Sequence, residues 1–374
     1  MKYIEEFRNA AVAKALASSI AAIAAPSRHY RLMEFCGGHT HTIHRYGLVG
    51  MLPKHVELIH GPGCPVCVLP IGRIDKAIAL ANLPNVILCS YGDMLRVPGS
   101  NRHSLLQAKA RGADVRMVYS VDDALHIATK NPNKEVVFFA IGFETTTPPT
   151  AAIILQAKQL KLINFSVFCN HVLTPVAMDN LLQAQHQEEQ PVNLDGFIGP
   201  AHVSILIGSQ AYEVVSKKYH KPIVISGFEP LDVLQSILML IEQINANQHE
   251  VLNQYTRAVT EQGNLLSQAL VDEVLMLRKT FEWRGLGNIP DSGLQIRPQY
   301  SNYDAEQRFN LPDSPGLEHK QCDCGAILRG IKKPMDCKLF ESVCTPENPL
   351  GACMVSSEGA CAAVYAYGRG SIPA

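Results

Sequence analysis

The sequence predicts an α/β protein with two Rossmann-like lobes, each built on a parallel sheet, followed by a small cysteine-rich lobe. Apolar strand-like runs alternate with helix-like segments as far as about residue 230, which is typical of parallel sheets with crossover helices. Two successive blocks share this layout. The pattern stops near residue 288, and six of the eleven cysteines lie beyond it. We therefore expect lobes at 1–130, 131–285 and 286–374.

The first lobe begins with an amphipathic helix at 10–25, which ends at Pro26 because proline cannot continue a helix. A strand at 55–63 then runs into a glycine-rich turn. The remaining elements of this lobe are helix 74–83, strand and loop 85–93, helix 104–113, strand 114–120 and helix 121–131.

The second lobe opens with a buried strand and loop at 134–149, and a helix at 150–161 follows. The next expected elements are strand 165–171, helix 175–185, strand and loop 194–208, helix 209–219, strand and loop 221–230, and a long helical region at 232–281. Beyond residue 288 the chain is rich in turn formers. A metal is expected to hold this last lobe together, because so short a segment has little core of its own.

Charge and composition argue against several classes of protein. The formal net charge is −1, whereas a protein that binds nucleic acid through its phosphates normally carries a basic excess. No run of about 18 uncharged apolar residues occurs, so no membrane span is expected. Lys14 interrupts the apolar N-terminal stretch, unlike the core of a secretory signal. We expect a cytoplasmic protein with no nucleic-acid or membrane partner.

Eleven cysteines are many for a cytosolic chain, and a reducing compartment favours metal binding or transient thiol chemistry. Three lie near the start and six crowd the last stretch, so two cysteine sites are the simplest account. Ligands of open parallel sheets bind at the loops that follow the strands. Small and polar residues fill seven such loops, at 34–41, 61–67, 90–100, 142–148, 170–172, 199–204 and 227–230. None carries a nucleotide-binding fingerprint.

The stretch CGGHTH places one thiol, Cys36, and two imidazoles, His39 and His41, within six residues. Thiolate and imidazole are both iron ligands, and a protonated histidine also activates a neighbouring thiol as a nucleophile. Histidines in such a position more often orient a neighbouring group by hydrogen bonding than bind the metal.

The stretch GPGCPVC brings Cys64 and Cys67 together at a spacing shared by redox dithiols and by halves of metal sites. Structural zinc would usually bring a second CxxC pair, but the nearest upstream cysteine is Cys36. Three thiols make an open site with positions free for other ligands, which suits iron that is being built into a cofactor.

The terminal cysteines are widely spaced in a loop-rich segment, which suits a [4Fe–4S] cluster with four thiolate ligands. The candidates for the four positions are Cys322 or Cys324, Cys337, Cys344 and Cys361. Zinc bound by four cysteines is the alternative, although the CxxC pairs that it prefers are absent. Cys353 is expected to be a spare buried thiol, and Glu358 a loop residue or an orienting group.

Together, FCGGHTH, GPGCPVC, GFETTTP and the terminal CDCG…PMDCKLF…CTPENPLGACMVSSEGACAAVYAYGR resemble the HypD family, whose members help to build the metal centre of [NiFe] hydrogenases. These motifs span nearly the whole chain and are specific in combination. The resemblance implies two α/β lobes and a third lobe that carries a [4Fe–4S] cluster on the terminal cysteines.

The resemblance also implies partners and residue roles. With a small partner, HypC, the protein would form a scaffold on which Fe(II) becomes an Fe(CN)₂CO unit, with cyanide supplied by HypE. HypC would then provide the link to the hydrogenase large subunit. Cys36, Cys64 and Cys67 match the family's thiols near the iron. Cys36 is the expected iron ligand, and His39 or His41 tunes its thiol or passes protons. Cys64 and Cys67 act as a redox pair or contact the iron.

Two other functions stay open on the sequence. One is a thiol–disulfide oxidoreductase that uses Cys64 and Cys67, whose pair would begin the first helix after a strand. The other is a passive binding scaffold with structural zinc in the last lobe.

Overall fold

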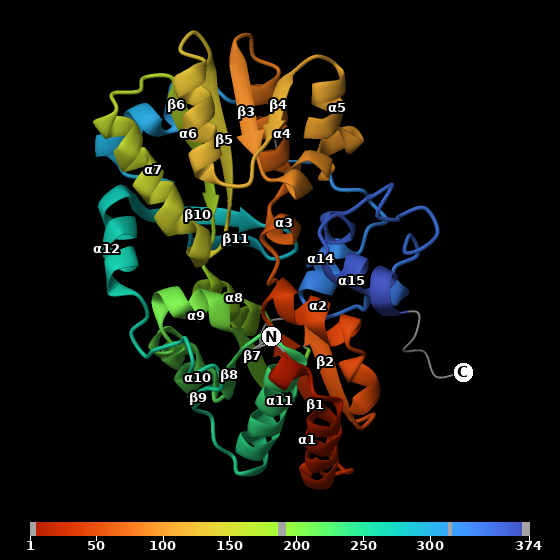
Figure 1. Ribbon diagram of the computed structural model, residues 1–374. Helices are drawn as coiled ribbons and strands as arrows, with labels where there is room; N and C mark the ends of the chain where they lie inside the picture. The colour runs from red at the N-terminus through yellow and green to blue at the C-terminus, as the bar shows by residue number, and fades with distance from the viewer. Residues whose placement is uncertain (1–4, 186–191, 313–315, 369–374) are drawn as a thin grey trace.

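The computed structural model describes residues 5–185, 192–312 and 316–368, and it confirms the α/β class. Two parallel sheets form an upper and a lower lobe, and the cysteine-rich segment packs beside their junction (Figure 1). Arg369, the last residue of the terminal motif, lies outside the described residues.

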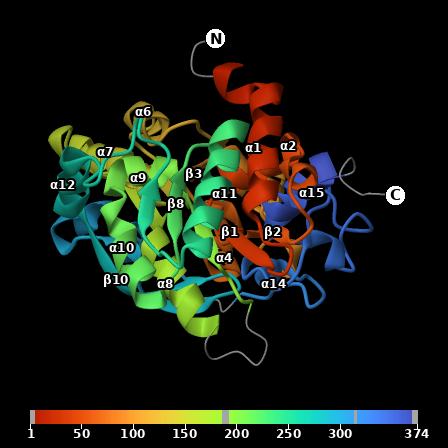
Figure 2. The same cartoon turned by 90° about the horizontal axis from the view of Figure 1, so that it is seen from below.

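The lower sheet combines strands from both halves of the chain. Its strands run parallel in the order β2-β1-β7-β8-β9. They are β1 (Tyr30–Glu34), β2 (Val56–His60), β7 (Gly196–Pro200), β8 (Ile223–Ser226) and β9 (Val251–Asn253). The helices α1 (Ala10–Ile23) and α11 (Pro230–Asn245) lie side by side against this sheet (Figure 2).

The upper sheet has four parallel strands in the order β4-β3-β5-β6. They are β3 (Val86–Ser90), β4 (Asp114–Met117), β5 (Glu135–Gly142) and β6 (Phe165–His171). Strands on both sides of residue 130 therefore share one sheet, which the expected division into 1–130 and 131–285 did not anticipate. The chain leaves the lower sheet after β2, builds the upper sheet, and returns at β7.

Apolar strand runs explain why the upper sheet is buried on both faces. Every residue of β6 is buried, and the stacked rings of Phe139 and Phe168 lie 5.5 Å apart between neighbouring strands. Crossover helices cover the sheets. The helices of the two α/β lobes, besides α1 and α11, are α2 (Gly37–Arg45), α3 (Pro65–Val68), α4 (Ile71–Ala81), α5 (Leu105–Ala110), α6 (Val121–Lys130), α7 (Thr147–Gln159), α8 (Thr174–Gln185), α9 (Ala201–Ile207) and α10 (Glu213–Tyr219).

The helical region expected at 232–281 is confirmed only in part, because strands interrupt and end it. Helix α11 ends at Asn245, and Asn247 adopts a left-handed backbone conformation with φ 53° that stops helical propagation. The chain then forms β9, a second helix α12 (Leu265–Val274), and a strand β10 (Leu275–Trp283). In β10 the apolar side chains at Phe281 and Trp283 are buried two residues apart, which is strand and not helix spacing.

The turn-rich stretch near residue 288 likewise contains a strand, β11 (Gly287–Ile296), paired antiparallel with β10. A bulge lies between Arg278 and Thr280, and Pro290 opposes Thr280 in this two-stranded sheet, where an edge position tolerates a missing N–H. The Trp283 indole N–H donates to Ser292 Oγ at 2.9 Å. The hairpin lies between the two large sheets (Figure 1).

The last lobe is loop-rich as expected, and its described helices are the short α13 (Ala305–Arg308), α14 (Cys324–Leu328) and α15 (Ala360–Tyr367). The 3₁₀ turns of the chain are η1 (Glu5–Arg8), η2 (Leu48–Met51), η3 (Gly92–Arg96), η4 (Ser100–Arg102), η5 (Glu144–Thr146), η6 (Gln210–Tyr212), η7 (Pro298–Tyr303), η8 (Pro334–Asp336) and η9 (Ala352–Met354). Within the described residues, no helix combines the length and the apolar character that crossing a bilayer requires.

Candidate thiol and metal site

The ends of the two sheets meet at a shared junction, where α3 is drawn between the lobes (Figure 1). The turn η5, which follows β5 of the upper sheet, packs against α9, which follows β7 of the lower sheet. The polar loops that the sequence places after strands are thereby brought together from both sheets.

Cys36 lies in the loop between β1 and α2 and is only 3% exposed. Its backbone N–H donates to Glu34 Oε2 at 3.0 Å, and the Gly37 N–H donates to Gly63 O at 3.0 Å. A Cβ built on Gly63 would lie 2.2 Å from the Cys36 nitrogen. Only glycine fits there, so the GPG of the GPGCPVC stretch is a close-packed frame for the Cys36 loop.

The imidazole that contacts Cys36 belongs to His202, not to either histidine of CGGHTH. His202 Nδ1 lies 3.5 Å from Cys36 Sγ, and the residue sits in the first turn of α9. The loop at 199–204 was among those expected to bind a ligand, but no role was predicted for this histidine. The sequence does contain one indication of such a role: this histidine lies two residues after the end of a buried strand, where ligands of parallel sheets bind.

Both partners in this contact are neutral at neutral pH. Burial, and next the nearby Glu358 carboxyl, raise the pKa of the Cys36 thiol well above its ordinary value. Burial lowers the pKa of His202 to about 4. A thiolate would therefore form at Cys36 mainly when a cation takes the place of its proton, because metal binding displaces thiol protons.

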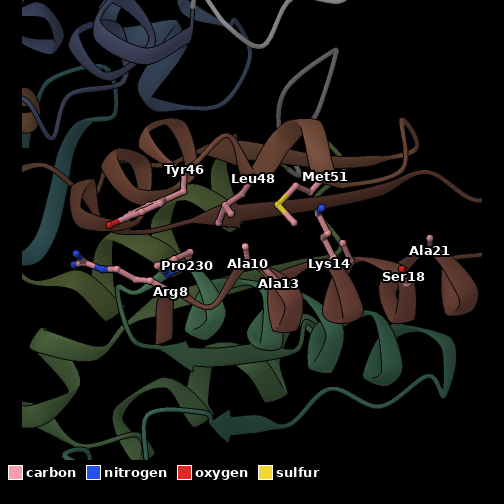
Figure 3. Close-up of a pocket in the computed structure, with 11 residues that line it drawn as sticks. Arg8, Ala10, Ala13, Lys14, Ser18, Ala21, Tyr46, Leu48, Met51 and Pro230 are labelled. Atoms are coloured by element: carbon pink, nitrogen blue, oxygen red, sulfur yellow. The ribbon is translucent and has the colours of Figure 1, made fainter. Parts of the chain in front are cut away.

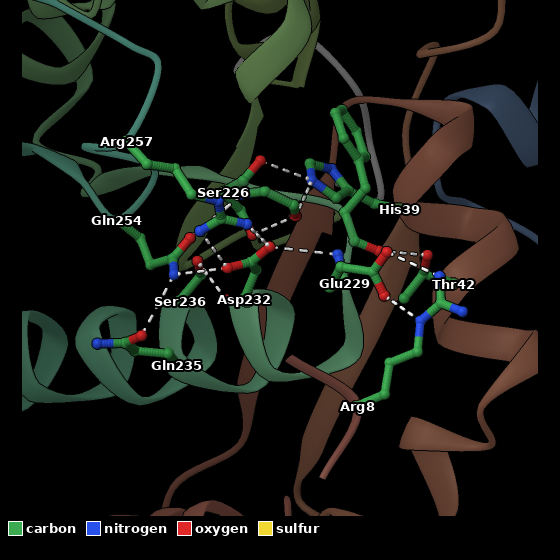
Figure 4. Close-up of polar contacts among 12 residues, drawn as sticks. Arg8, His39, Thr42, Ser226, Glu229, Asp232, Gln235, Ser236, Gln254 and Arg257 are labelled. Atoms are coloured by element: carbon green, nitrogen blue, oxygen red, sulfur yellow. Dashed lines mark hydrogen bonds and ion pairs between the residues drawn. The ribbon is translucent and has the colours of Figure 1, made fainter. Parts of the chain in front are cut away.

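His39 and His41 have other contacts. His39 Nε2 lies 3.1 Å from both the Ser226 and Gly227 carbonyl oxygens, so this nitrogen carries the proton, and the ring stacks on Phe228 (Figure 4). It therefore ties α2 to the loop after β8. Burial lowers its pKa to about 4. The His41 ring packs edge-on against Tyr367 with centroids 5.2 Å apart.

A charged network holds this β8 loop in place. Asp232 is fully buried, and both of its oxygens accept hydrogen bonds from Arg257, at 2.9 and 2.5 Å. Nearby, Glu229 pairs with Arg8, and Thr42 donates to the Phe228 carbonyl (Figure 4). The loop against which His39 packs is thus anchored from α11 and from η1.

Cys64 and Cys67 lie at α3, directly after the frame glycines in the chain. Cys64 is the N-cap of α3, and its Sγ accepts from the Cys67 N–H at 3.3 Å. The two Sγ atoms are 2.7 Å apart, and the residues are 3% and 1% exposed. Burial, and next a hydrogen bond with Cys353, raise the pKa of Cys67. The pair is thus in mutual contact and is accessible mainly to other side chains of the same chain.

Cys353 connects the two groups of cysteines. Its thiol is within side-chain interaction range of Cys67 on one side and of Cys361 on the other. It also lies 2.6 Å from Cys324 Sγ. Cys322 and Cys324 are likewise within side-chain interaction range of each other. The residue expected to be a spare thiol therefore stands between the CxxC pair and the terminal cysteines.

The donor set of the last lobe fits a [4Fe–4S] cluster. Cys344 is within electrostatic range of Cys322 and Cys337, and Cys361 is within range of Cys322 and Cys344. A Cβ on Gly351 would lie 2.6 Å from Cys322 Sγ, so a glycine makes room for this thiol. Within the described residues, no three His, Cys, Asp or Glu side chains are placed to hold one metal ion. A cluster needs less convergence, because each thiolate binds a different iron.

The GFETTTP loop supplies a buried carboxyl at the end of β5. Glu144 accepts hydrogen bonds from the Thr174 N–H at 2.7 Å and from its Oγ1 at 2.9 Å. Burial raises the pKa of Glu144 to about 7. The fully buried Tyr212 is within electrostatic range of both Glu144 and Cys36, so the carboxyl belongs to the surroundings of the Cys36 site.

An apolar open groove lies elsewhere. It has a volume of about 690 Å³ and runs between α1 and the segment that links α2 to β2, with small side chains of α1 facing Tyr46, Leu48 and Met51 (Figure 3). Among the described residues, no thiol, imidazole or carboxylate lines this groove. It does not contribute to the thiol site.

Comparisons with known proteins agree with these motifs. A family model described as "HypD: Hydrogenase formation hypA family" matches residues 11–368. The hydrogenase maturation factor HypD of Azotobacter vinelandii is 62% identical over 369 residues, which cover 99% of this chain and 97% of that protein. HypD of Cupriavidus necator is 60% identical over 370 residues (99% and 98%), and HypD of Escherichia coli is 50% identical over 341 residues (91% and 90%).

Proposed function

Because this chain belongs to the HypD family of hydrogenase maturation factors, we propose that it holds iron together with HypC while the Fe(CN)₂CO unit is assembled. In this proposal HypE supplies the cyanide, and HypC links the protein to the hydrogenase large subunit. The assembly takes place in the cytoplasm. The observation that carries the proposal is the buried Cys36 thiol beside a neutral His202, set on the same glycine frame as the Cys64–Cys67 pair.

Cys36 is the proposed ligand from this chain to the iron. Burial and the Glu358 carboxyl disfavour a free thiolate, so the thiol loses its proton as the cation arrives. His202 is neutral and within reach of that Sγ, so it can accept the proton at Nδ1 when its other nitrogen is the protonated one. The remaining coordination positions of the iron stay open to a ligand from HypC and to cyanide and carbon monoxide.

The thiol chain is the proposed path for reducing equivalents. When the Cys64–Cys67 dithiol closes to a disulfide it releases two electrons and two protons, and a Cys324–Cys353 disulfide that reopens takes up the same number. Cys353 is the point of exchange, because it contacts both Cys67 and Cys324.

Cys324 is thus engaged with Cys353, and Cys322, Cys337, Cys344 and Cys361 are the proposed cluster ligands. A bound [4Fe–4S] cluster supplies single-electron chemistry at that end of the chain.

A stand-alone thiol–disulfide oxidoreductase is supported by one feature. Cys64 begins the first helix after β2, where such a pair is expected. However, both thiols are buried, so an external disulfide has poor access to them. Insulin reduction by the isolated protein would favour this alternative. Zinc without iron and sulfide in anaerobically purified protein would favour the passive scaffold.

The test is an infrared spectrum of the protein purified anaerobically with HypC. Bands of iron-bound cyanide and carbon monoxide are expected for the parent protein. They should disappear in Cys36→Ala while the visible absorbance of the cluster persists. Cys89→Ala is the matched control, because Cys89 is also fully buried but lies on β3 of the upper sheet. Bands that persist in Cys36→Ala would overturn the assignment of Cys36.

A further inference from the structure

A pair of histidines faces a small cavity on the side of the lower lobe next to the cysteine-rich lobe. His44 lies on α2 and His60 is the last residue of β2. Their Nε2 atoms share a hydrogen bond at 3.2 Å, and the rings are inclined by 34° with centroids 5.2 Å apart. Neither residue has a part in the function proposed above.

A contact with the Glu34 carboxylate fixes the tautomer of His60. Its Nδ1 lies 2.8 Å from Glu34 Oε1, and Glu34 is buried. A buried carboxylate accepts at this position, so Nδ1 carries the proton and Nε2 presents a lone pair to the cavity. A carboxylate that orients a histidine in this way is the usual support of a metal-binding imidazole.

The surroundings leave room for a metal ion. Both histidines line a cavity of about 190 Å³, which accommodates several water molecules. Lys332 and Lys333 also line it, but each is paired, with Asp323 at 2.8 Å and with Glu57 at 2.7 Å. The Glu57 carboxylate itself stands at the cavity wall. The local cations are thus neutralised by carboxylates.

We propose that His44 and His60 bind one divalent late first-row transition-metal ion through their Nε2 atoms, with water at the remaining positions. Imidazole is a preferred ligand for this class of ions. Two protein ligands are the full set, because no third His, Cys, Asp or Glu among the described residues converges there. Fe(II) is the member that the proposed function would supply, and only this identification rests on that function.

Glu34 gives the site a connection to the thiol centre. One of its oxygens accepts from His60, and the other accepts from the Cys36 backbone N–H at 3.0 Å. The Glu34 carboxylate therefore links an ion bound at His60 to the loop that begins at Cys36. This arrangement makes the pair a holding site beside the centre where the iron is built into its product.

The experiment is an anaerobic titration of untagged, cluster-loaded protein with Co(II). Imidazole and water ligands give weak visible ligand-field bands, whereas thiolate ligands add intense charge-transfer bands in the near ultraviolet. The parent protein should bind one equivalent that shows the first kind of band, separate from any Co(II) at Cys36, which would show the second kind. His44→Phe and His60→Ala should each weaken that binding at least tenfold, since even the loss of an orienting partner costs a metal site about that much.

His126→Ala is the matched control, because His126 also lies beside another side chain's polar atom, Asp122 Oδ2 at 3.3 Å, but on the surface of α6. It should titrate like the parent in the weak ligand-field bands, as should Cys36→Ala, which loses only thiolate bands. Because Cys36→Ala loses the infrared bands but keeps the histidine site, the two proposals fail separately. The absence of the weak bands, with thiolate bands alone, or unchanged weak bands in the folded His44→Phe variant, would overturn the two-histidine site.

Discussion

The Sγ atoms of Cys324 and Cys353 lie 2.6 Å apart, although 29 residues separate them in the chain. Through Cys353 the contact continues to Cys67, in a different lobe. Two groups of cysteines that are distant in sequence therefore form one connected path of thiols.

Replacing Cys353 with Ser should interrupt this path. The Cys64–Cys67 contact does not involve Cys353, so this pair should still form a disulfide under mild oxidation. Exchange between Cys67 and Cys324 should be lost, because the intermediate sulfur is missing. Mass-spectrometric mapping of disulfides after stepwise oxidation measures both. Cys89→Ala should leave the map unchanged, and a Cys67–Cys324 exchange that survives in Cys353→Ser would contradict the path.

Replacing Cys344 with Ala should remove the cluster absorbance and lower the unfolding temperature of the last lobe. Its Sγ accepts from the Leu350 N–H at 3.3 Å and is within range of two other cysteines. A lobe with few regular elements depends strongly on its metal centre for folding. Cys353→Ser is the comparison, since that thiol is outside the proposed ligand set. Equal loss of absorbance in both variants would argue against the set.

The sequence predicts the parallel strands because their apolar runs are continuous, as at Phe138 and Phe139. It does not predict which strands share a sheet, because pairing partners such as β1 and β7 are not encoded in local patterns. The strand β10 was mistaken for helix because its apolar residues continue the pattern of α12. His202 was missed because 166 residues separate it from Cys36.

Gly63→Ala should destabilise the protein by about 1–3 kcal/mol, the usual cost of overpacking a tight site. The added Cβ would lie 2.2 Å from the Cys36 nitrogen, so the Cys36 loop must shift. Denaturant unfolding measures the change in the free energy of unfolding. At Gly50 a Cβ meets nothing within 4 Å, and Gly50→Ala should stay within about 0.5 kcal/mol. Similar values for the two variants would contradict the close packing.

Asp232→Ala should cost about 3 kcal/mol, because it removes a buried carboxylate and strands the charge of Arg257. The loop of Gly227 and Phe228, to which His39 is bonded, should loosen and become more accessible to hydrogen exchange. Glu213→Ala breaks an exposed pair with Lys217 and should cost under about 1 kcal/mol. Unchanged exchange of this loop in Asp232→Ala would show that the network does not hold it.

Glu144→Gln should change how stability depends on pH. The pKa of Glu144 is raised from 4.5 to about 7 by burial, so the folded state holds this proton more tightly than the unfolded state. The stability from the protonated carboxyl is fully present below pH 4.5 and is lost as the pH rises through about 7. The lost stability amounts to at most about 3 kcal/mol. Glutamine does not titrate, so the variant does not lose stability at this position as the pH rises.

The measurement is the free energy of unfolding of parent and variant across this pH range. The advantage of the parent over Glu144→Gln should shrink steadily as the pH rises. Glu213→Gln is the control, since Glu213 is exposed and should leave the pH profile parallel to that of the parent. A constant difference between parent and Glu144→Gln would mean that Glu144 ionises in the folded protein as readily as in water. The carboxyl beside Tyr212 would then be charged at neutral pH, which would alter the electrostatic surroundings of Cys36.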